Sequence, residues 1–293
     1  MDSRFLETFL LVAELGSIAE AARRLDLTPA TVAQRLSALE ATIGSKLVLR
    51  SGRTVRPTVA GLRVLPRAHA VLRELRDLKS AASETALPAG PLRLGATPTA
   101  LTGIVPGVLK RWVEAYPQIE IYIEPGATTA LHSRVMDGEL DAAILVQPQF
   151  ELPKTAAWHT LRREPLVLLT PSSLRVTDVL QTLAREPFIR YDRHVIGGRM
   201  ADEYLSRKGI HPQVRFELDG IENIARLVAE GLGVSVLPDW PVVGLPSQAV
   251  AKWPLPRPRP VRTVGVLWLQ ATVRAPLVKA FVRLAGPAPR APA

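Results

Sequence analysis

The feature that most constrains the fold is a pair of short amphipathic helices within the first 45 residues. Ser17 can cap a helix that runs to Leu25, because a serine hydroxyl accepts a hydrogen bond from a free backbone N–H. After a short break, Thr28 and Pro29 have the pattern of the N-cap and first position of a second helix, which ends near Thr42. Two short helices joined by a tight turn predict a helix-turn-helix.

The second of these helices has one apolar face and one face of small and polar residues. Val32, Leu36, Leu39 and Ile43 recur at spacings of four, three and four, which predicts a buried stripe. Small outward residues let a helix enter the major groove, where Gln34 can bond adenine edges and Arg35 can bond guanine or phosphate. The residues predicted to contact DNA from this helix are Thr28, Pro29, Ala30, Thr31, Ala33, Gln34 and Arg35.

Positive charge is concentrated in the same region. Residues 22–63 contain eight basic and two acidic side chains, within a chain of net charge +10. Such a patch favours a phosphate backbone as partner. The alternative is a three-helix scaffold with a solvated basic face, because helix-turn-helix geometry also occurs outside DNA binding.

A small hairpin, or wing, is predicted after the second helix. Residues 47–49 and 54–55 favour extended structure, and Ser51-Gly52 is a turn signal between them. Arg50, Arg53 and Arg56 flank this turn, where they could reach a neighbouring DNA backbone or minor groove.

A long helix is predicted from Thr58 to about Ala86, with a kink at Pro66. Its heptad positions predict a seam for pairing with a second copy of the chain. The seam residues are Leu65, Ala68, Leu72, Leu75 and Ala82. The alternative is a helix that packs on its own domain.

From Leu92 onward, strands alternate with helices, which predicts a parallel sheet with right-handed crossovers. The turns at Thr97-Pro98-Thr99 and at residues 126–129, which include Thr128 and Thr129, would lie at the carboxyl ends of two strands, the usual place for a ligand. Two helix N-termini facing one cleft favour a carboxylate or a similar anion. Alternatively, each threonine simply caps its helix.

Several classes of function are disfavoured. The chain has no cysteine and five scattered histidines, and it shows no hydrolase, phosphate-loop or dinucleotide motif. We therefore expect no catalytic residue, metal or cofactor. The charged residues among the first 15 argue against a signal peptide, and no apolar stretch of about 18 residues predicts a membrane span, so we expect a cytoplasmic protein that does not bind membranes. A solute-binding or transport-linked protein, an enzyme with a DNA anchor, and an architectural DNA binder are the rival interpretations.

The N-terminal 60 residues resemble the signature of LysR-type transcriptional regulators. The resemblance is carried by residues 16–25 (GSIAEAARRL), by residues 27–36 (LTPATVAQRL) and by residues 57–61 (PTVAG). Where this chain has Ala33, Gln34 and Val48, the family often has Ser, Arg and Phe. The first two departures lie on the presumed DNA-contacting face and leave the operator sequence open.

This resemblance implies three parts. Residues 1–57 would form a winged helix-turn-helix, and residues 58–87 a linker helix that forms a homodimer, with a homotetramer left open. Residues 91–293 would form a two-lobed α/β effector domain resembling periplasmic binding proteins, with lobe 1 at about 91–161 and 266–293 and lobe 2 at about 162–265. A small molecule between the lobes would then control binding to double-stranded DNA.

The resemblance also places further residues at the effector cleft. Gln147, Tyr191 and Asp219 each come at the end of a predicted strand, at positions that line the cleft in related regulators. Asp219 would suit an amino group of the ligand, or it could cap the helix that follows.

Overall fold

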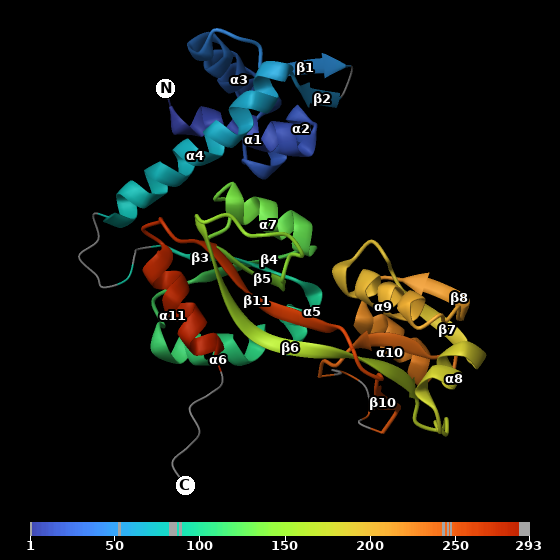
Figure 1. Ribbon diagram of the computed structural model, residues 1–293. Coiled ribbons are helices and arrows are strands. Elements are labelled where there is room, and N and C mark those ends of the chain that lie inside the picture. The colour runs from blue at the N-terminus through green and yellow to red at the C-terminus, as the bar shows by residue number, and fades with distance from the viewer. Residues whose placement is uncertain are drawn as a thin grey trace. The chain divides into compact units, whose positions relative to one another are not determined.

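The structure is a computed structural model that describes residues 2–51, 54–81, 87, 90–241, 244, 246 and 248–286. The chain forms two compact units, one built mainly from residues up to 89 and one mainly from residue 90 onward (Figure 1). Each unit is described separately.

The N-terminal unit contains the predicted helix-turn-helix and hairpin. Gly16, with φ of 62°, ends the first helix, and the Ser17 hydroxyl accepts from the Glu20 N–H at 3.3 Å at the start of the second. Thr28 caps the third helix through its hydroxyl, which accepts from the Thr31 N–H at 3.2 Å. The elements are α1 (Ser3–Leu15), α2 (Ile18–Arg24), α3 (Pro29–Ile43), β1 (Val48–Ser51), β2 (Thr54–Pro57) and α4 (Val59–Ala81).

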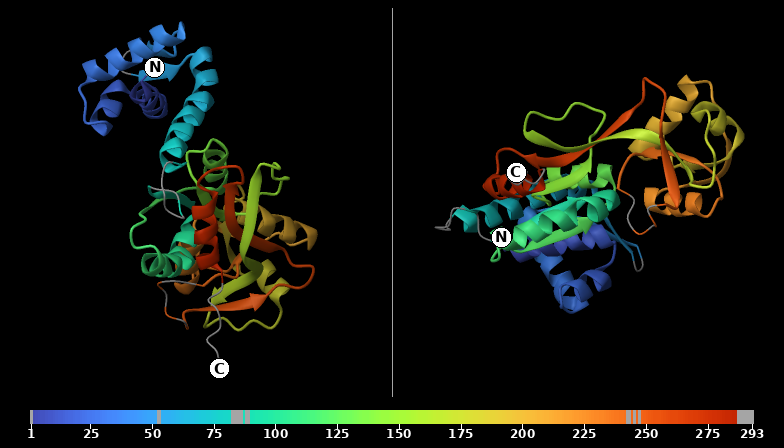
Figure 2. Two further views of the ribbon diagram at one scale, coloured as in Figure 1. Left: turned by 90° about the vertical axis from the view of Figure 1, so that its left-hand side faces the viewer. Right: turned by 90° about the horizontal axis from the view of Figure 1, so that it is seen from below.

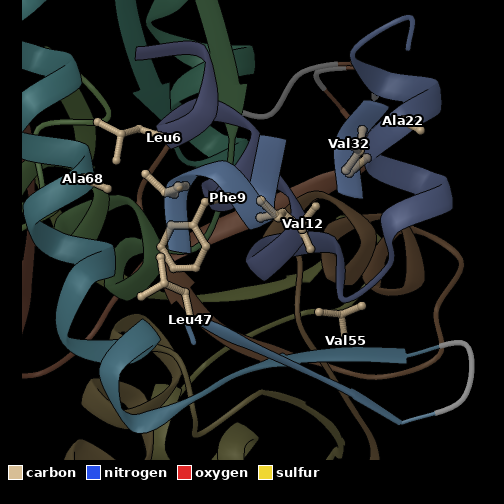
Figure 3. Close-up of a cluster of buried hydrophobic side chains, with 11 residues drawn as sticks. Leu6, Phe9, Val12, Ala22, Val32, Leu47, Val55 and Ala68 are labelled. Atoms are coloured by element: carbon tan, nitrogen blue, oxygen red, sulfur yellow. The ribbon is translucent and has the colours of Figure 1, made fainter. Parts of the chain in front are cut away.

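One apolar core holds these elements together. Figure 3 shows Phe9 of α1 in this core, with Leu6 and Leu47 around it. The α3 stripe predicted from spacing enters the same core through Val32, Leu36 and Leu39, all buried, whereas Ile43 is partly buried at its margin. Burial of each large apolar side chain contributes about 1.5–3 kcal/mol to the stability of the fold. Because the buried side chains of α3 lie on one stripe, packing holds the helix through that face only.

A buried carboxylate fixes the hairpin against the end of α3. Glu40 is 7% exposed, and its Oε1 accepts hydrogen bonds from the N–H groups of Leu47 (2.9 Å) and Val48 (3.3 Å). Lys46 Nζ donates to its Oε2 at 2.6 Å. Burial by itself raises the pKa of Glu40, but these hydrogen bonds outweigh it and leave the pKa lowered. The carboxylate therefore links the end of α3 to the start of the hairpin.

The packing of the long helix α4 shows that part of the predicted dimer seam was wrong. Ala68 is buried in the core of its own unit, and Leu65 and Leu72 pack against that core. These three side chains therefore do not form a seam for another chain. Their packing agrees with the alternative, a helix that packs on its own domain. Leu75 is 40% exposed. The helix continues through Pro66, and Ala82 lies outside the described residues.

The C-terminal unit contains the predicted parallel crossovers. Strand β3 pairs in parallel with β4 and with β5, and β11 continues the sheet in antiparallel pairing with β5. We call this part lobe 1. Its elements are β3 (Leu92–Ala96), α5 (Pro98–Gly103), α6 (Val105–Ala115), β4 (Ile121–Pro125), α7 (Thr128–Met136), β5 (Ala142–Val146) and α11 (Ala275–Ala285), with the first part of β6 (Ala156–Pro171) and the last part of β11 (Val261–Leu269).

A second group of elements forms lobe 2. Strands β7 and β8 pair in parallel, and the helices of the lobe pack around two buried apolar clusters. The elements are α8 (Val179–Arg185), β7 (Pro187–Tyr191), α9 (Ile196–Arg207), β8 (Gln213–Leu218), α10 (Ile221–Ala229), β9 (Ser235–Pro238) and β10 (Val250–Pro254).

Two strands connect the lobes. Residues 156–165 of β6 pair with β11, whereas residues 166–171 pair with β9 and β10 in lobe 2. Figure 1 and Figure 2 show β6 running from one lobe to the other. The expected lobe boundaries, 161/162 and 265/266, fall inside these continuous strands.

The Gly197-Gly198 pair lies at the start of helix α9 (Ile196–Arg207). Both glycines lie in the first turn of α9 and are buried. A Cβ atom on Gly198 would lie 1.9 Å from the Asp192 carbonyl oxygen. The pair is therefore required by close approach of the helix to the end of β7 rather than by turn geometry.

We predict that Glu40→Ala destabilises the N-terminal unit by about 2 kcal/mol, because it leaves buried N–H groups without an acceptor. Since the pKa of Glu40 is lowered in the folded chain, its contribution is complete above the ordinary value of 4.5 and is lost as the pH falls through the folded value. Urea unfolding followed by circular dichroism measures both effects. Glu14→Ala, at an exposed position of α1, is the matched control; equal losses in the two variants would contradict the assignment.

Candidate functional site

The outward face of α3 is a surface of small and polar side chains. Thr28, Pro29, Ala30 and Gln34 are exposed, and Thr31 and Ala33 are half-buried. The Thr28 and Thr31 hydroxyls are hydrogen-bonded to each other at 2.8 Å. The N-terminal half of α3 therefore presents little bulk beyond the backbone, which is what close approach to base edges requires.

Arg35 is less available than its sequence position suggests. It is half-buried, and its Nη1 donates to the Thr8 hydroxyl of α1 at 3.4 Å. The guanidinium thus also contributes to packing between α1 and α3, a role that the sequence did not reveal.

The wing presents two exposed arginines on different strands. Arg50 is register-paired with the buried Val55, and Arg56 is paired with the exposed Leu49. Because side chains alternate along a strand, the two arginines belong to opposite faces of the hairpin. Arg53 lies outside the described residues.

The C-terminal unit contains a cavity of about 240 Å³. It is lined by residues at the starts of α5, α7, α9 and α10, and by Val146 and Arg262. Of the residues predicted to bind an effector, the cavity is lined by Thr97, Pro98, Thr99, Thr128, Thr129, Tyr191 and Asp219. Gln147 is not among its lining residues; it is exposed, and its N–H donates to the Thr263 carbonyl at 2.8 Å.

The two threonine turns differ in their hydrogen bonding. Thr97 occupies the N-cap position of α5 but makes no capping bond with its side chain. Its residue is 6% exposed, and its Oγ1 has no hydrogen-bond partner among the described residues. Thr128 Oγ1, by contrast, accepts from the Val146 N–H at 3.3 Å. A buried hydroxyl without a partner is costly, so Thr97 is the stronger candidate for contact with a ligand.

Asp219 does not cap α10, because the N-cap residue is Gly220. The exposed Asp219 side chain accepts from the Gly220 N–H at 2.6 Å. Its carboxylate is therefore already engaged at the edge of the cavity.

Tyr191 and Arg262 bring two further buried polar groups to the cavity. Burial raises the pKa of Tyr191 to about 12, although the charge of Arg262 acts in the opposite direction. The phenol thus stays protonated at neutral pH and can donate a hydrogen bond. Arg262 is 2% exposed, and its Nε and Nη2 donate to Oε2 of the buried Glu164 at 2.8 and 2.5 Å.

Neither a metal centre nor a membrane span appears in the part of the chain that the structure describes. Over those residues, no three His, Asp or Glu side chains are grouped so that they could hold a metal ion. No helix there is both long and apolar enough to cross a bilayer.

Comparison with known families gives two matches that together span most of the chain. The family described as "LysR substrate binding domain" matches residues 85–288, and "Bacterial regulatory helix-turn-helix protein, lysR family" matches residues 3–62. The chain belongs to the LysR family. It is a DNA-binding transcriptional regulator with a helix-turn-helix and a domain that binds a small-molecule effector between two lobes.

Individual LysR-type relatives align along most of their length. The chain is 30% identical to the HTH-type transcriptional regulator YofA of Bacillus velezensis, over 81% of this chain and 81% of that protein. It is 29% identical to the HTH-type transcriptional activator IlvY of Salmonella typhimurium, over 82% of this chain and 83% of that protein.

Solved structures share the fold of this LysR-type chain. A full-length OxyR variant from Pseudomonas aeruginosa superposes with a TM-score of 0.73 and 25% identity, covering 97% of this chain and 94% of that one. CbnR in complex with its target DNA superposes with a TM-score of 0.64 and 21% identity, covering 98% and 100%.

Arg262 and Glu164 of this LysR-type chain were not among the residues predicted to line the cavity. Arg262 lies at the start of β11, directly after Pro260 and Val261. The first turns of α9 and α10 were also missed as lining elements. A charged residue that alternates with apolar ones at the start of a buried strand was the available signal.

Thr97→Val and Thr128→Val are predicted to have opposite effects on the stability of the C-terminal unit. Thr97→Val removes a hydroxyl that has no partner, so stability should stay unchanged or rise by about 1 kcal/mol. Thr128→Val removes the acceptor of the Val146 N–H and should cost about 1 kcal/mol. Thermal unfolding of the two variants measures the difference; a larger loss in Thr97→Val would show that its hydroxyl is satisfied within the protein.

Proposed function

We propose that this regulator contacts duplex DNA through the N-terminal half of α3 and through the wing. The observation that carries the proposal is the exposed, small-residue surface of α3, held outward by a core that takes up its opposite face. Gln34 is positioned to bond base edges, and Arg50, Arg53 and Arg56 are assigned to the phosphate backbone. The proposed contacts on α3 are Thr28, Pro29, Ala30, Thr31, Ala33, Gln34 and Arg35.

We further propose that the active form is a homodimer. Two recognition helices must reach two half-sites about one helical turn apart, which one copy cannot do. Support comes from α4, where Val71, Leu75 and Leu78 are 41%, 40% and 68% exposed on one side of the helix. We therefore keep the proposed role of the linker helix at residues 58–87. Leu75 of the predicted seam is retained, and Val71 and Leu78 take the place of Leu65, Ala68 and Leu72. Mass measurement in solution distinguishes a dimer from a tetramer.

The effector is proposed to bind in the cavity between the lobes, against Thr97, Pro98, Thr99, Thr128, Thr129, Tyr191 and Asp219. The buried, unpartnered Thr97 hydroxyl supports this assignment. Binding there favours one arrangement of the lobes, and control of DNA binding requires that the effector prefer that arrangement over others.

A regulatory rather than catalytic role, and a cytoplasmic location, complete the proposal. The similar proteins are transcriptional regulators, and the proposed target is DNA.

Two substitutions should separate base contacts from phosphate contacts. Gln34→Ala should change which sequences are recovered from random duplex DNA and cost about tenfold in affinity at the preferred site, the value of one lost base contact. Arg56→Ala should weaken binding to all sequences and make the slope of log affinity against log salt less steep by about 1 per protomer. Fluorescence anisotropy over a salt series measures both.

Arg175→Ala is the matched control, because Arg175 is an exposed arginine of the C-terminal unit. An Arg56 variant with the salt slope of the control would remove Arg56 from the interface. A Gln34 variant that loses affinity equally at every sequence would show that Gln34 does not distinguish bases.

A further inference from the structure

A charged side chain at the effector cavity is almost completely buried. Arg262, on β11, lines the cavity at 2% exposure, and its register partner on β6 is Glu164. Both residues lie on the two strands that connect the lobes. A guanidinium is rarely withdrawn from water unless its donors are used. The Glu164 bonds use Nε and Nη2, and the guanidinium also interacts with the Tyr191 hydroxyl. Because a guanidinium has five N–H donors, these partners leave donors for a further acceptor.

Neutral donors surround the same space. The Thr97 hydroxyl is buried without a partner among the described residues, and the Tyr191 phenol stays protonated. The first turns of α7, α9 and α10 also line the cavity, and neither α9 nor α10 has a side-chain cap bond. Free N–H groups at helix starts carry partial positive charge. The cavity therefore offers hydrogen-bond donors from both lobes.

Two carboxylates also line the cavity, and each accepts a hydrogen bond from a neutral donor. Asp219 accepts from the Gly220 N–H, and Glu222 accepts from the Thr102 hydroxyl at 2.5 Å. Glu164 faces the guanidinium from the strand ladder. Arg199 is a second cationic side chain of the lining, but it is exposed and so is already solvated.

On the basis of the effector site proposed above, we propose that the effector is a compact carboxylate and that Arg262 binds its carboxylate group. The planar guanidinium matches the geometry of a carboxylate, with Thr97 and Tyr191 as further donors. A cavity of about 240 Å³ can accommodate a small organic acid. Binding to Arg262 places the ligand directly on the strands that join the lobes.

Thermal-shift titration of the full chain tests this proposal. The probes are pyruvate, lactate and benzoate, each compared with its neutral amide at equal ionic strength, together with inorganic phosphate. At least one carboxylate should raise the melting temperature, and its amide should not. The double variant Arg262→Gln with Glu164→Gln removes both buried charges together, and it should weaken carboxylate binding by about tenfold to a hundredfold.

Glu164→Gln alone provides the discriminating result. It keeps the guanidinium and removes its competing carboxylate, so carboxylate affinity should rise by about threefold or more. If Glu164→Gln weakens binding in parallel with the double variant, the pair is only structural and the proposal is overturned. Two further results would overturn the proposal. One is loss of carboxylate binding in Arg199→Gln, which would assign the binding to Arg199. The other is binding of phosphate or of the amides in place of the carboxylates. Circular dichroism of the unliganded variants confirms that each is folded.

Thr97→Val separates this proposal from the effector site itself. Probe binding that needs Thr97 but not Arg262 keeps the cavity as the effector site and rejects only the carboxylate anchor. If no probe binds in a way that depends on Thr97 or on Arg262, the result counts against both the effector site and the carboxylate anchor.

Discussion

The antiparallel pairing of β6 with β11 is the interaction on which the C-terminal unit depends. Each strand passes from one lobe to the other, so the ladder that they share sets the distance between the two halves of the cavity. Glu164 and Arg262 are direct partners on this ladder and are both buried. An ion pair in that position is costly to desolvate and must keep its hydrogen bonds, which gives the connection between the lobes a defined geometry.

The N-terminal unit uses a buried carboxylate in a comparable way. Glu40 accepts two backbone N–H groups at the start of the hairpin and a lysine ammonium at its edge. The hairpin is thereby fixed relative to the end of α3, and Thr58, whose hydroxyl donates to the Lys46 carbonyl, begins α4 from the same segment. The attachment of the hairpin to α3 and α4 thus follows from a short set of hydrogen bonds to residues 46–48.

Much of the N-terminal fold could be predicted because its signals are local. Ser17, Thr28 and Pro29 mark helix starts through bonds within three residues, and Gly16 and Gly44 end helices through positive φ. In the effector cavity, the ends of parallel strands likewise predicted Thr97 and Thr128. By contrast, Arg262 and Glu164 are separated by 98 positions, and the first half of β6 is too polar to resemble a buried strand. The predicted dimer seam of α4 was partly wrong, because the same spacing of apolar residues suits a helix that packs on a partner chain and one that packs on its own core.

The central claim is that a ligand in the interlobe cavity changes how the N-terminal unit engages DNA. The most direct measurement is hydroxyl-radical footprinting on a duplex selected by the protein, with and without a small molecule that stabilises the chain and loses this effect in Thr97→Val. We expect the protected length or the affinity to change at saturating ligand. Identical footprints and affinities with the cavity filled, or no binding to duplex DNA at low ionic strength, would contradict it.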